Sequence, residues 1–139
     1  MPVPDYTARI RPVILLVDDY ADALPAWEIF LQAEGFDVLT AASGPEALAT
    51  VTDSSPDLVV LDLALPGISG CDVARTLRST MSTQHIPLIA ATGFSDAVQL
   101  EQARLAGFDT VLVKPCDPTV LAARIRELLT GPPQPAASS

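Results

Sequence analysis

The chain has 139 residues, enough for one domain with its own core, and 49% of them are hydrophobic, which argues against a disordered chain. Its 17 acidic residues against 8 basic ones give a net charge of −9, which disfavours nucleic acid and anionic membranes and favours metal cations or basic partners. No apolar run would span a bilayer, the N-terminus lacks a signal-peptide core, and two cysteines are too few for a disulfide framework, so we expect a cytoplasmic protein.

Five short apolar segments are the predicted strands. In chain order they span residues 13–17, 36–40, 58–63, 86–91 and 111–113. Four of them are almost wholly apolar and often β-branched, the pattern of parallel strands that are buried on both faces. The segment 36–40 (FDVLT) alternates between apolar and polar residues instead, as an edge strand does.

Each predicted strand is followed by a segment with a helix-start signal. A polar side chain that can accept from the first free N–H groups precedes every one of them. Prolines at 25, 45 and 118 fall in the first turn, where the missing N–H costs nothing. The predicted capping residues are Asp22, Ser43, Ser69, Ser95 and Asp117, and Gly107 is the predicted stop of the fourth helix.

This order of elements predicts the fold class. A strand followed by a helix, repeated five times, indicates an α/β protein with a doubly wound five-stranded parallel sheet, a (βα)5 three-layer sandwich of the flavodoxin-like type. We expect a single domain over residues 12–130, preceded by an N-terminal arm (1–11). The Pro/Ala/Ser-rich residues 131–139 are predicted to be a flexible tail or a linker stub.

Polar residues stand where the predicted strands end. Asp18 and Asp19 end the first strand, Asp62 lies in the third, Thr92 ends the fourth and Lys114 follows the fifth. Ligands of open α/β sheets bind beyond these carboxyl ends. Adjacent carboxylates repel each other but become favourable around a divalent cation, so the residues predict a Mg²⁺ site suited to phosphoryl chemistry.

The same residues carry a family resemblance. The acid pair Asp18-Asp19, Asp62 in VVLDLALPGISG, Thr92 in AATG, and Lys114-Pro115 in VLVKP occur in this order on the expected elements. Together they resemble the receiver domain of bacterial two-component response regulators, of the CheY-like superfamily. The resemblance covers roughly residues 12–130 and implies the flavodoxin-like fold predicted above.

The resemblance implies a role for each residue. Asp62 would be the phosphoacceptor, which takes a phosphoryl group from the phosphohistidine of a histidine kinase or a phosphotransfer protein. Mg²⁺, or Mn²⁺ in its place, would be bound by Asp19, Asp62 and the carbonyl of Ala64, with Asp18 acting through water. Lys114 would neutralise phosphoryl charge, and Thr92 would move toward the phosphate. Such a module catalyses its own phosphorylation and dephosphorylation and is not a metabolic enzyme.

The resemblance also concerns output and partners. Receivers usually carry an aromatic residue three positions before the lysine, whose ring swings inward on activation, whereas this chain has Val111. A downstream protein would dock on the face of the fourth helix, fifth strand and fifth helix, with no direct nucleic-acid contact and no membrane insertion. The polar residues expected on this face are Gln99, Gln102, Arg104, Arg124 and Glu127.

Several alternatives stay open at this point. A hydrolase of the haloacid dehalogenase type would need an acid two residues after the nucleophile, where Ala64 stands, and a Rossmann nucleotide binder would need glycines after the first strand, where two aspartates stand. Within the receiver interpretation, the chain could be a stand-alone regulator, a receiver segment of a hybrid histidine kinase, or a receiver-like scaffold that is not phosphorylated.

Overall fold

The computed structural model describes residues 11–18, 23–65, 67–93 and 97–130. Within these ranges strands and helices alternate strictly along the chain. Their order and bounds are β1 (Val13–Val17), α1 (Ala23–Ala33), β2 (Asp37–Ala41), α2 (Gly44–Ser54), β3 (Leu58–Leu61), α3 (Gly70–Ser79), β4 (Leu88–Thr92), α4 (Ala97–Ala106), β5 (Thr110–Val113) and α5 (Pro118–Thr130).

The described strands form one parallel sheet in the order β2-β1-β3-β4-β5. This is the flavodoxin-like order, in which the chain winds outward on both sides of β1 and β3. The predicted α/β fold with a doubly wound parallel sheet is therefore confirmed. The prediction that the alternating second strand lies at an edge is also confirmed, because β2 pairs with β1 alone among the described strands.

The prediction of burial on both faces is correct for the three inner strands and wrong for β5. Every residue of β3 and β4 is buried, and in β1 only Val13 is half-exposed. In contrast, the first three residues of β5 are half-buried and Val113 is 38% exposed. The reason is that β5 is the second edge of the sheet, since it pairs with β4 alone among the described strands.

Several predicted strand bounds shift by one or two residues, and the two largest shifts are in the third and fourth strands. The third strand ends at Leu61 rather than at residue 63, and the fourth begins at Leu88 rather than at residue 86. Pairing explains the first shift, since β1 ends at Val17, which is the partner of Leu61. Asp62 therefore follows β3 at the sheet edge instead of lying within the strand.

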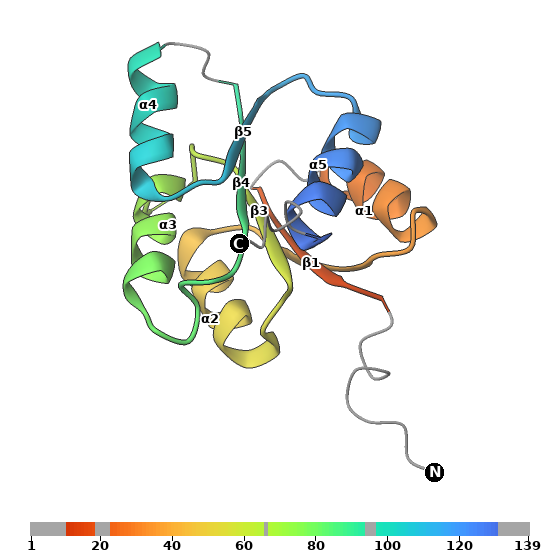
Figure 1. The fold of residues 1–139 in the computed structure, drawn as a ribbon, viewed down its shortest axis with the longest axis horizontal. Coiled ribbons are helices and arrows are strands. Elements are labelled where there is room, and N and C mark those ends of the chain that lie inside the picture. The colour runs from red at the N-terminus through yellow and green to blue at the C-terminus, as the bar shows by residue number, and fades with distance from the viewer. Residues whose placement is uncertain (1–10, 19–22, 66, 94–96, 131–139) are drawn as a thin grey trace, which may run out of the picture.

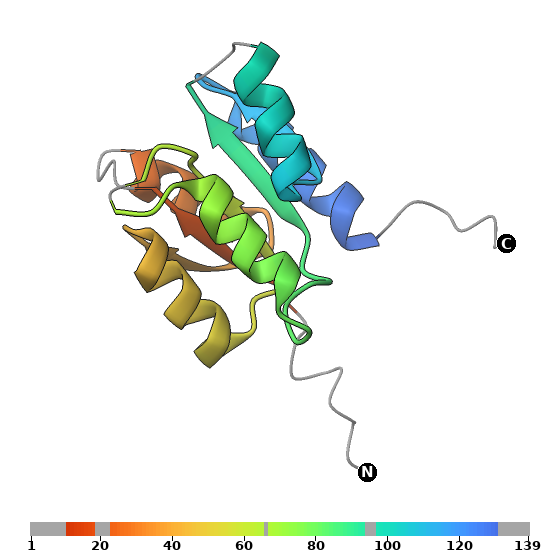
Figure 2. The ribbon, with the colours of Figure 1, turned by 90° about the vertical axis from the view of Figure 1, so that its left-hand side faces the viewer.

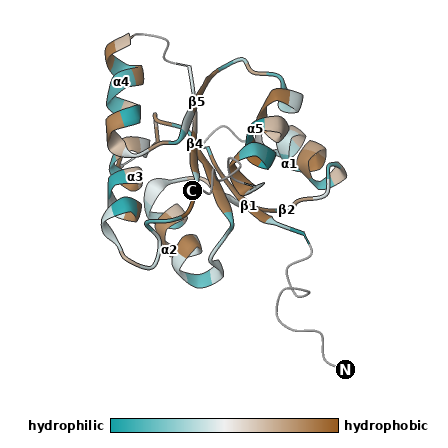
Figure 3. Ribbon diagram, viewed as in Figure 1, coloured by the Kyte–Doolittle hydropathy of each residue, from teal (hydrophilic) through white to brown (hydrophobic). Residues whose placement is uncertain are grey.

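Helices cover both faces of the sheet and make a three-layer molecule (Figure 1, Figure 2). On one face, Ile14 and Leu16 of β1 pack with Leu31 of α1 and with Leu121 and Ile125 of α5. On the other face, Leu15 and Val17 of β1 pack with residues of α2, α3 and α4. Figure 3 shows the central strands in the brown of apolar residues, whereas the helices alternate between brown and teal. Alternate residues of each inner strand thus fill two separate cores.

Local signals fix the helix ends as predicted where the structure describes them. The Ser43 hydroxyl accepts from the Glu46 N–H (3.2 Å), and the Ser69 hydroxyl accepts from the Asp72 N–H (3.2 Å). The Asp117 carboxylate accepts from the N–H of Thr119 at the start of α5 (2.8 Å). The predicted caps Asp22 and Ser95 lie outside the described residues.

The ends of the chain are described only in part. Of the predicted arm, the structure describes Arg11, whose guanidinium lies 2.9 Å from the Asp37 carboxylate and donates to the carbonyl of Phe36 (2.9 Å). The predicted tail 131–139 lies outside the described residues. Among the helices described, none has the length and apolar character that crossing a membrane requires.

Candidate functional site

Three ionisable side chains meet at the carboxyl-end edge of the sheet. Asp18 follows β1, Asp62 follows β3 and Lys114 follows β5. Backbone hydrogen bonds extend the sheet ladder through these positions: Asp18 N–H donates to Ala41 (3.1 Å) and Asp62 N–H donates to Val17 (2.9 Å). The Lys114 N–H likewise donates to the carbonyl of Thr92 (2.7 Å). The sheet itself therefore sets where the side chains begin.

Lys114 links the two acids. Its Nζ lies 2.6 Å from Oδ2 of Asp18 and 3.3 Å from Oδ2 of Asp62. The other carboxylate oxygen of Asp62, Oδ1, accepts a hydrogen bond from the backbone N–H of Ala64 (3.0 Å). Residues that are far apart in the sequence thus form one connected polar cluster, and both oxygens of Asp62 have a fixed donor.

The cluster is mostly withdrawn from water. Asp18 is 6% exposed and Asp62 is 8% exposed. Burial raises the pKa of Asp62 above its ordinary value, although the hydrogen bond from Ala64 and the charge of Lys114 work against that shift. Burial alone would lower the pKa of Lys114, but the hydrogen bond to Asp18 and the charge of Asp62 outweigh it and leave that pKa raised. The ammonium therefore stays charged at neutral pH.

The donor chemistry of the cluster fits a divalent cation. Two buried carboxylates share one ammonium, so their negative charge is only partly compensated, and carboxylate oxygens are the ligands that Mg²⁺ prefers. The predicted ligand Ala64 directly follows Leu63 at the same edge, whereas the predicted ligand Asp19 lies outside the described residues. Within the described ranges, no group of three His, Cys, Asp or Glu side chains could hold a metal ion.

The remaining predicted site residues lie beside the cluster. Thr92 is the last residue of β4 and is completely buried. The Lys114–Pro115 peptide bond is cis. Val111, the residue in place of the usual aromatic, is half-buried in β5 and packs against the core on the α2–α4 side.

Gly70 is a site residue to which the sequence analysis assigned no role. It opens α3, and its N–H donates to the carbonyl of Leu63 (2.9 Å). A Cβ atom at this position would overlap the carbonyl oxygen of Asp62 and lie 2.8 Å from Cα of Leu63. Only glycine lets α3 begin directly against the backbone of the site. The available signal was the glycine that follows the capping residue Ser69.

Trp27 of α1 also lies at the site. Trp27 packs, half-buried, against the core on the α1–α5 side of the sheet. It also lines a cavity of about 10 Å³ together with Asp18, Asp62 and Ala91. This volume is close to the minimum for one water molecule. Trp27 thus shares this small cavity with both aspartates.

Comparisons with known proteins identify the family of the chain. The sequence model of the family described as "Response regulator receiver domain" matches residues 14–126. The chain is 39% identical over 120 residues to the DNA-binding response regulator MtrA of Mycolicibacterium paratuberculosis, covering 86% of this chain and 52% of that protein. It is also 39% identical over 118 residues to the transcriptional regulatory protein AfsQ1 of Streptomyces coelicolor, covering 85% of this chain and 51% of that protein.

Solved structures show the same likeness. A response regulator from Chloroflexus aurantiacus matches with a TM-score of 0.83 and 30% identity, covering 87% of this chain and 99% of that chain. The signal receiver domain of a histidine kinase from Syntrophus aciditrophicus matches with a TM-score of 0.82 and 28% identity, covering 88% and 93%. The chain therefore spans almost all of these solved domains but about half the length of the two curated relatives.

Proposed function

Because the chain belongs to the response regulator receiver domain family, we propose that it accepts a phosphoryl group on Asp62 and passes the signal on by protein contact. The observation that carries this proposal is the placement of Lys114, whose ammonium lies within 3.3 Å of both buried carboxylates. A buried acid beside a fixed cation suits a nucleophile that must acquire, hold and release a highly charged group.

In the proposed reaction, a carboxylate oxygen of Asp62 attacks the phosphorus atom of a phosphohistidine on a histidine kinase or phosphotransfer protein. The new P–O bond forms as the P–N bond breaks, and the imidazole leaves with its bonding electron pair and takes a proton from water. The N–H of Ala64 and the ammonium of Lys114 hold Asp62 in place from opposite oxygens. Lys114 is then positioned to offset the added negative charge.

Asp18, Asp62, the carbonyl of Ala64 and the predicted ligand Asp19 would hold Mg²⁺ in this proposal, with Mn²⁺ as a substitute. When bound, the cation would compensate phosphate charge and orient phosphate oxygens. The protein's own contribution is to bring Asp18 and Asp62 from two neighbouring strands to the same edge and to keep them out of water.

The proposed output runs through Thr92 and the elements after it. A hydrogen bond from its hydroxyl to the phosphoryl group would draw the β4 end toward Asp62 and shift α4. Since Val111 cannot act as an aromatic switch, this shift would be the main signal. A protein partner would read it on the face of α4, β5 and α5. Arg104 and Arg124, two basic residues expected on this face, pair within their own helices with Glu101 and Glu127.

The proposal is tested by incubation with acetyl phosphate and Mg²⁺, followed by intact-mass analysis. We expect the wild-type chain to gain one phosphoryl group and the Asp62→Asn variant to gain none. Asp53→Asn, which changes an exposed acid of α2, is the control and should be phosphorylated like the wild type. Full labelling of Asp62→Asn, or none of the wild type, would overturn the proposal. The cytoplasmic location expected from the sequence stays a prediction.

A further inference from the structure

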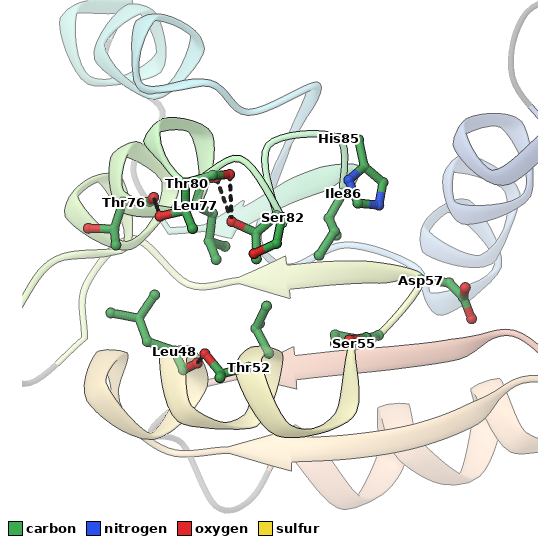
Figure 4. A pocket seen from close by; sticks show the side chains of 13 residues that line it. Leu48, Thr52, Ser55, Asp57, Thr76, Leu77, Thr80, Ser82, His85 and Ile86 are labelled. Carbon is green, nitrogen blue, oxygen red and sulfur yellow. Dashed lines mark hydrogen bonds between the residues drawn. The ribbon is translucent and has the colours of Figure 1, made fainter.

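A groove lies at the end of the sheet opposite to Asp62. It opens between the C-terminal halves of α2 and α3, near the segments that lead into β3 and β4 (Figure 4), and encloses about 550 Å³. That volume is in the usual range for small-molecule sites, roughly 300–1,000 Å³. Neither the receiver fold nor the proposed phosphoryl transfer accounts for a hollow at this end.

The floor of the groove is apolar. Leu48 and Val51 reach it from α2, Leu77 from α3 and Ile86 from the segment before β4. In Figure 4 the side chains of Leu48, Leu77 and Ile86 lie between the two helices. Val51, Leu77 and Ile86 are at most 3% exposed, so they form a fixed surface backed by the core. An apolar molecule would lose water on this floor and gain free energy from it.

The walls carry three threonine hydroxyls that already donate their protons to backbone carbonyls. Thr52 donates to Leu48 (3.0 Å), Thr76 to Asp72 (2.9 Å) and Thr80 to Thr76 (2.8 Å), in each case to a backbone carbonyl four residues earlier. A hydroxyl has one proton and two lone pairs. These three side chains can therefore only accept further hydrogen bonds, which favours a ligand that donates to them.

The charges in the lining point the same way. Among the described residues that line the groove there is no Lys or Arg, and His85 lies exposed at the rim. The Asp57 carboxylate accepts from the N–H of Val13 (2.8 Å) and points away from the groove (Figure 4). The chain as a whole carries a net charge of −9. An anionic ligand would face oxygen lone pairs without a fixed cation, which disfavours the phosphodonors of the opposite site.

We propose that this groove is a binding site for a small cationic amine with an apolar, ring-sized body. The body lies on the floor made by Leu48, Leu77 and Ile86, and the ammonium donates to the oxygens of Thr52 and Thr80. The site is separate from Asp62 and does not depend on phosphorylation.

Three probes that share one ring and differ in their head group test the proposal: 2-phenylethylamine, 2-phenylethanol and phenylacetate. Titration of the isotope-labelled full chain, followed by amide shifts, should show the amine binding with a dissociation constant of about 1 mM. The shifts should map to the groove residues of α2 and α3. We expect the alcohol to bind more weakly and the carboxylate most weakly.

The variant Thr52→Val/Thr80→Val keeps the shape of the walls and removes both acceptors. It should weaken amine binding about tenfold, the effect of losing one good hydrogen bond or two weak ones. Thr130→Val is the matched control, because Thr130 makes the same bond to Arg126 (2.9 Å) on α5. It should bind the amine like the wild type and also report the stability cost of the substitution.

Equal binding of phenylacetate, shifts that map outside the groove, or an amine affinity that the double variant leaves unchanged would each overturn the proposal. The proposal would also be overturned if none of the three probes bound at concentrations up to 20 times the expected dissociation constant. The Asp62→Asn variant should bind the amine normally. The result for the groove is therefore independent of the result for phosphoryl transfer.

Discussion

At the scale of single residues, the site is a balance between burial and charge. Asp62 is withdrawn from water, which raises its pKa, yet the proposed chemistry needs its ionised form. Lys114 and the N–H of Ala64 oppose the effect of burial without cancelling it. The ionised carboxylate therefore costs the fold free energy that a neutral side chain of the same shape would not cost.

This cost predicts a pH-dependent gain in stability for Asp62→Asn. The pKa of Asp62 is raised in the folded state. Protonation of Asp62 therefore stabilises the folded wild type at low pH, and this stabilisation is lost as pH rises through the raised pKa. In EDTA we expect the variant to be the more stable protein at pH 7. The difference should shrink as pH falls toward the ordinary Asp pKa of about 3.9. Urea unfolding between pH 4 and pH 8 measures it, and a gap that does not change with pH contradicts it.

At the scale of elements, α3 connects the two ends of the molecule. Its first residue, Gly70, lies against the backbone of Asp62, whereas Leu77 of its last turns and its C-cap residue Thr80 line the groove. From the last turn of α3, Arg78 donates to the carbonyls of Ile86 (2.7 Å) and Gly107 (2.9 Å) and pairs with Asp109. One helix thus rests on the site at its N-terminus and holds the loops before β4 and β5 at its C-terminus.

The close approach of α3 predicts a large effect for Gly70→Ala. The added Cβ would push the helix away from the carbonyl of Asp62, which should cost about 1–3 kcal/mol of stability and slow phosphorylation by acetyl phosphate. Gly93→Ala is the matched control beside Thr92, because a Cβ there meets no atom within 4 Å. Urea unfolding and phosphorylation rates check both. Equal effects of the two substitutions would show that the approach of α3 is not limiting.

At the scale of the whole molecule, the parallel sheet gathers the site. Lys114 and Asp18 are 96 residues apart in the sequence, and their contact exists only because β1, β3, β4 and β5 run in the same direction and end at the same edge. Lys114 is also the only lysine of the chain. The ion pairs Lys114–Asp18 and Lys114–Asp62 therefore connect the β5 edge of the sheet to its centre.

Without these ion pairs, we expect the stability of the protein to depend on divalent cations. Lys114→Met leaves Asp18 and Asp62 facing each other at low exposure, which should cost on the order of 2 kcal/mol in EDTA. Mg²⁺ should stabilise the folded wild type by mass action and so raise its Tm. At a Mg²⁺ concentration ten times the dissociation constant, the free energy of unfolding should rise by about 1.4 kcal/mol. Mg²⁺ should raise Tm more in Lys114→Met, where the cation replaces the ammonium.

Thermal unfolding measures this difference, with Arg75→Met as the control, because Arg75 makes an exposed pair with Asp72 on α3. Trp27, the only tryptophan of the chain, gives a second reading, because it lines the cavity beside both carboxylates and its emission should change with Mg²⁺. An identical Mg²⁺ response in wild type and Lys114→Met would count against a shared cation site.

The sequence by itself determined the order of the elements, because hydrophobic period and capping side chains act over a few residues. It placed β2 at an edge and Ser43, Ser69 and Asp117 at helix starts, as the structure has them. It also singled out Asp18, Asp62, Thr92 and Lys114, since polar residues at the ends of apolar strands have few structural explanations.

Only the tertiary structure decided what depends on neighbours far away in the chain. The sequence pattern of β5 matched that of the inner strands, yet β5 forms an edge, because strand position depends on which strands pair and not on apolar content. The tight fit of Gly70 against Asp62 and the groove between α2 and α3 likewise arise from how helices settle on the sheet. Local composition determines which segments form helices and strands. Packing between these elements determines the distances between side chains, their burial and the position of grooves.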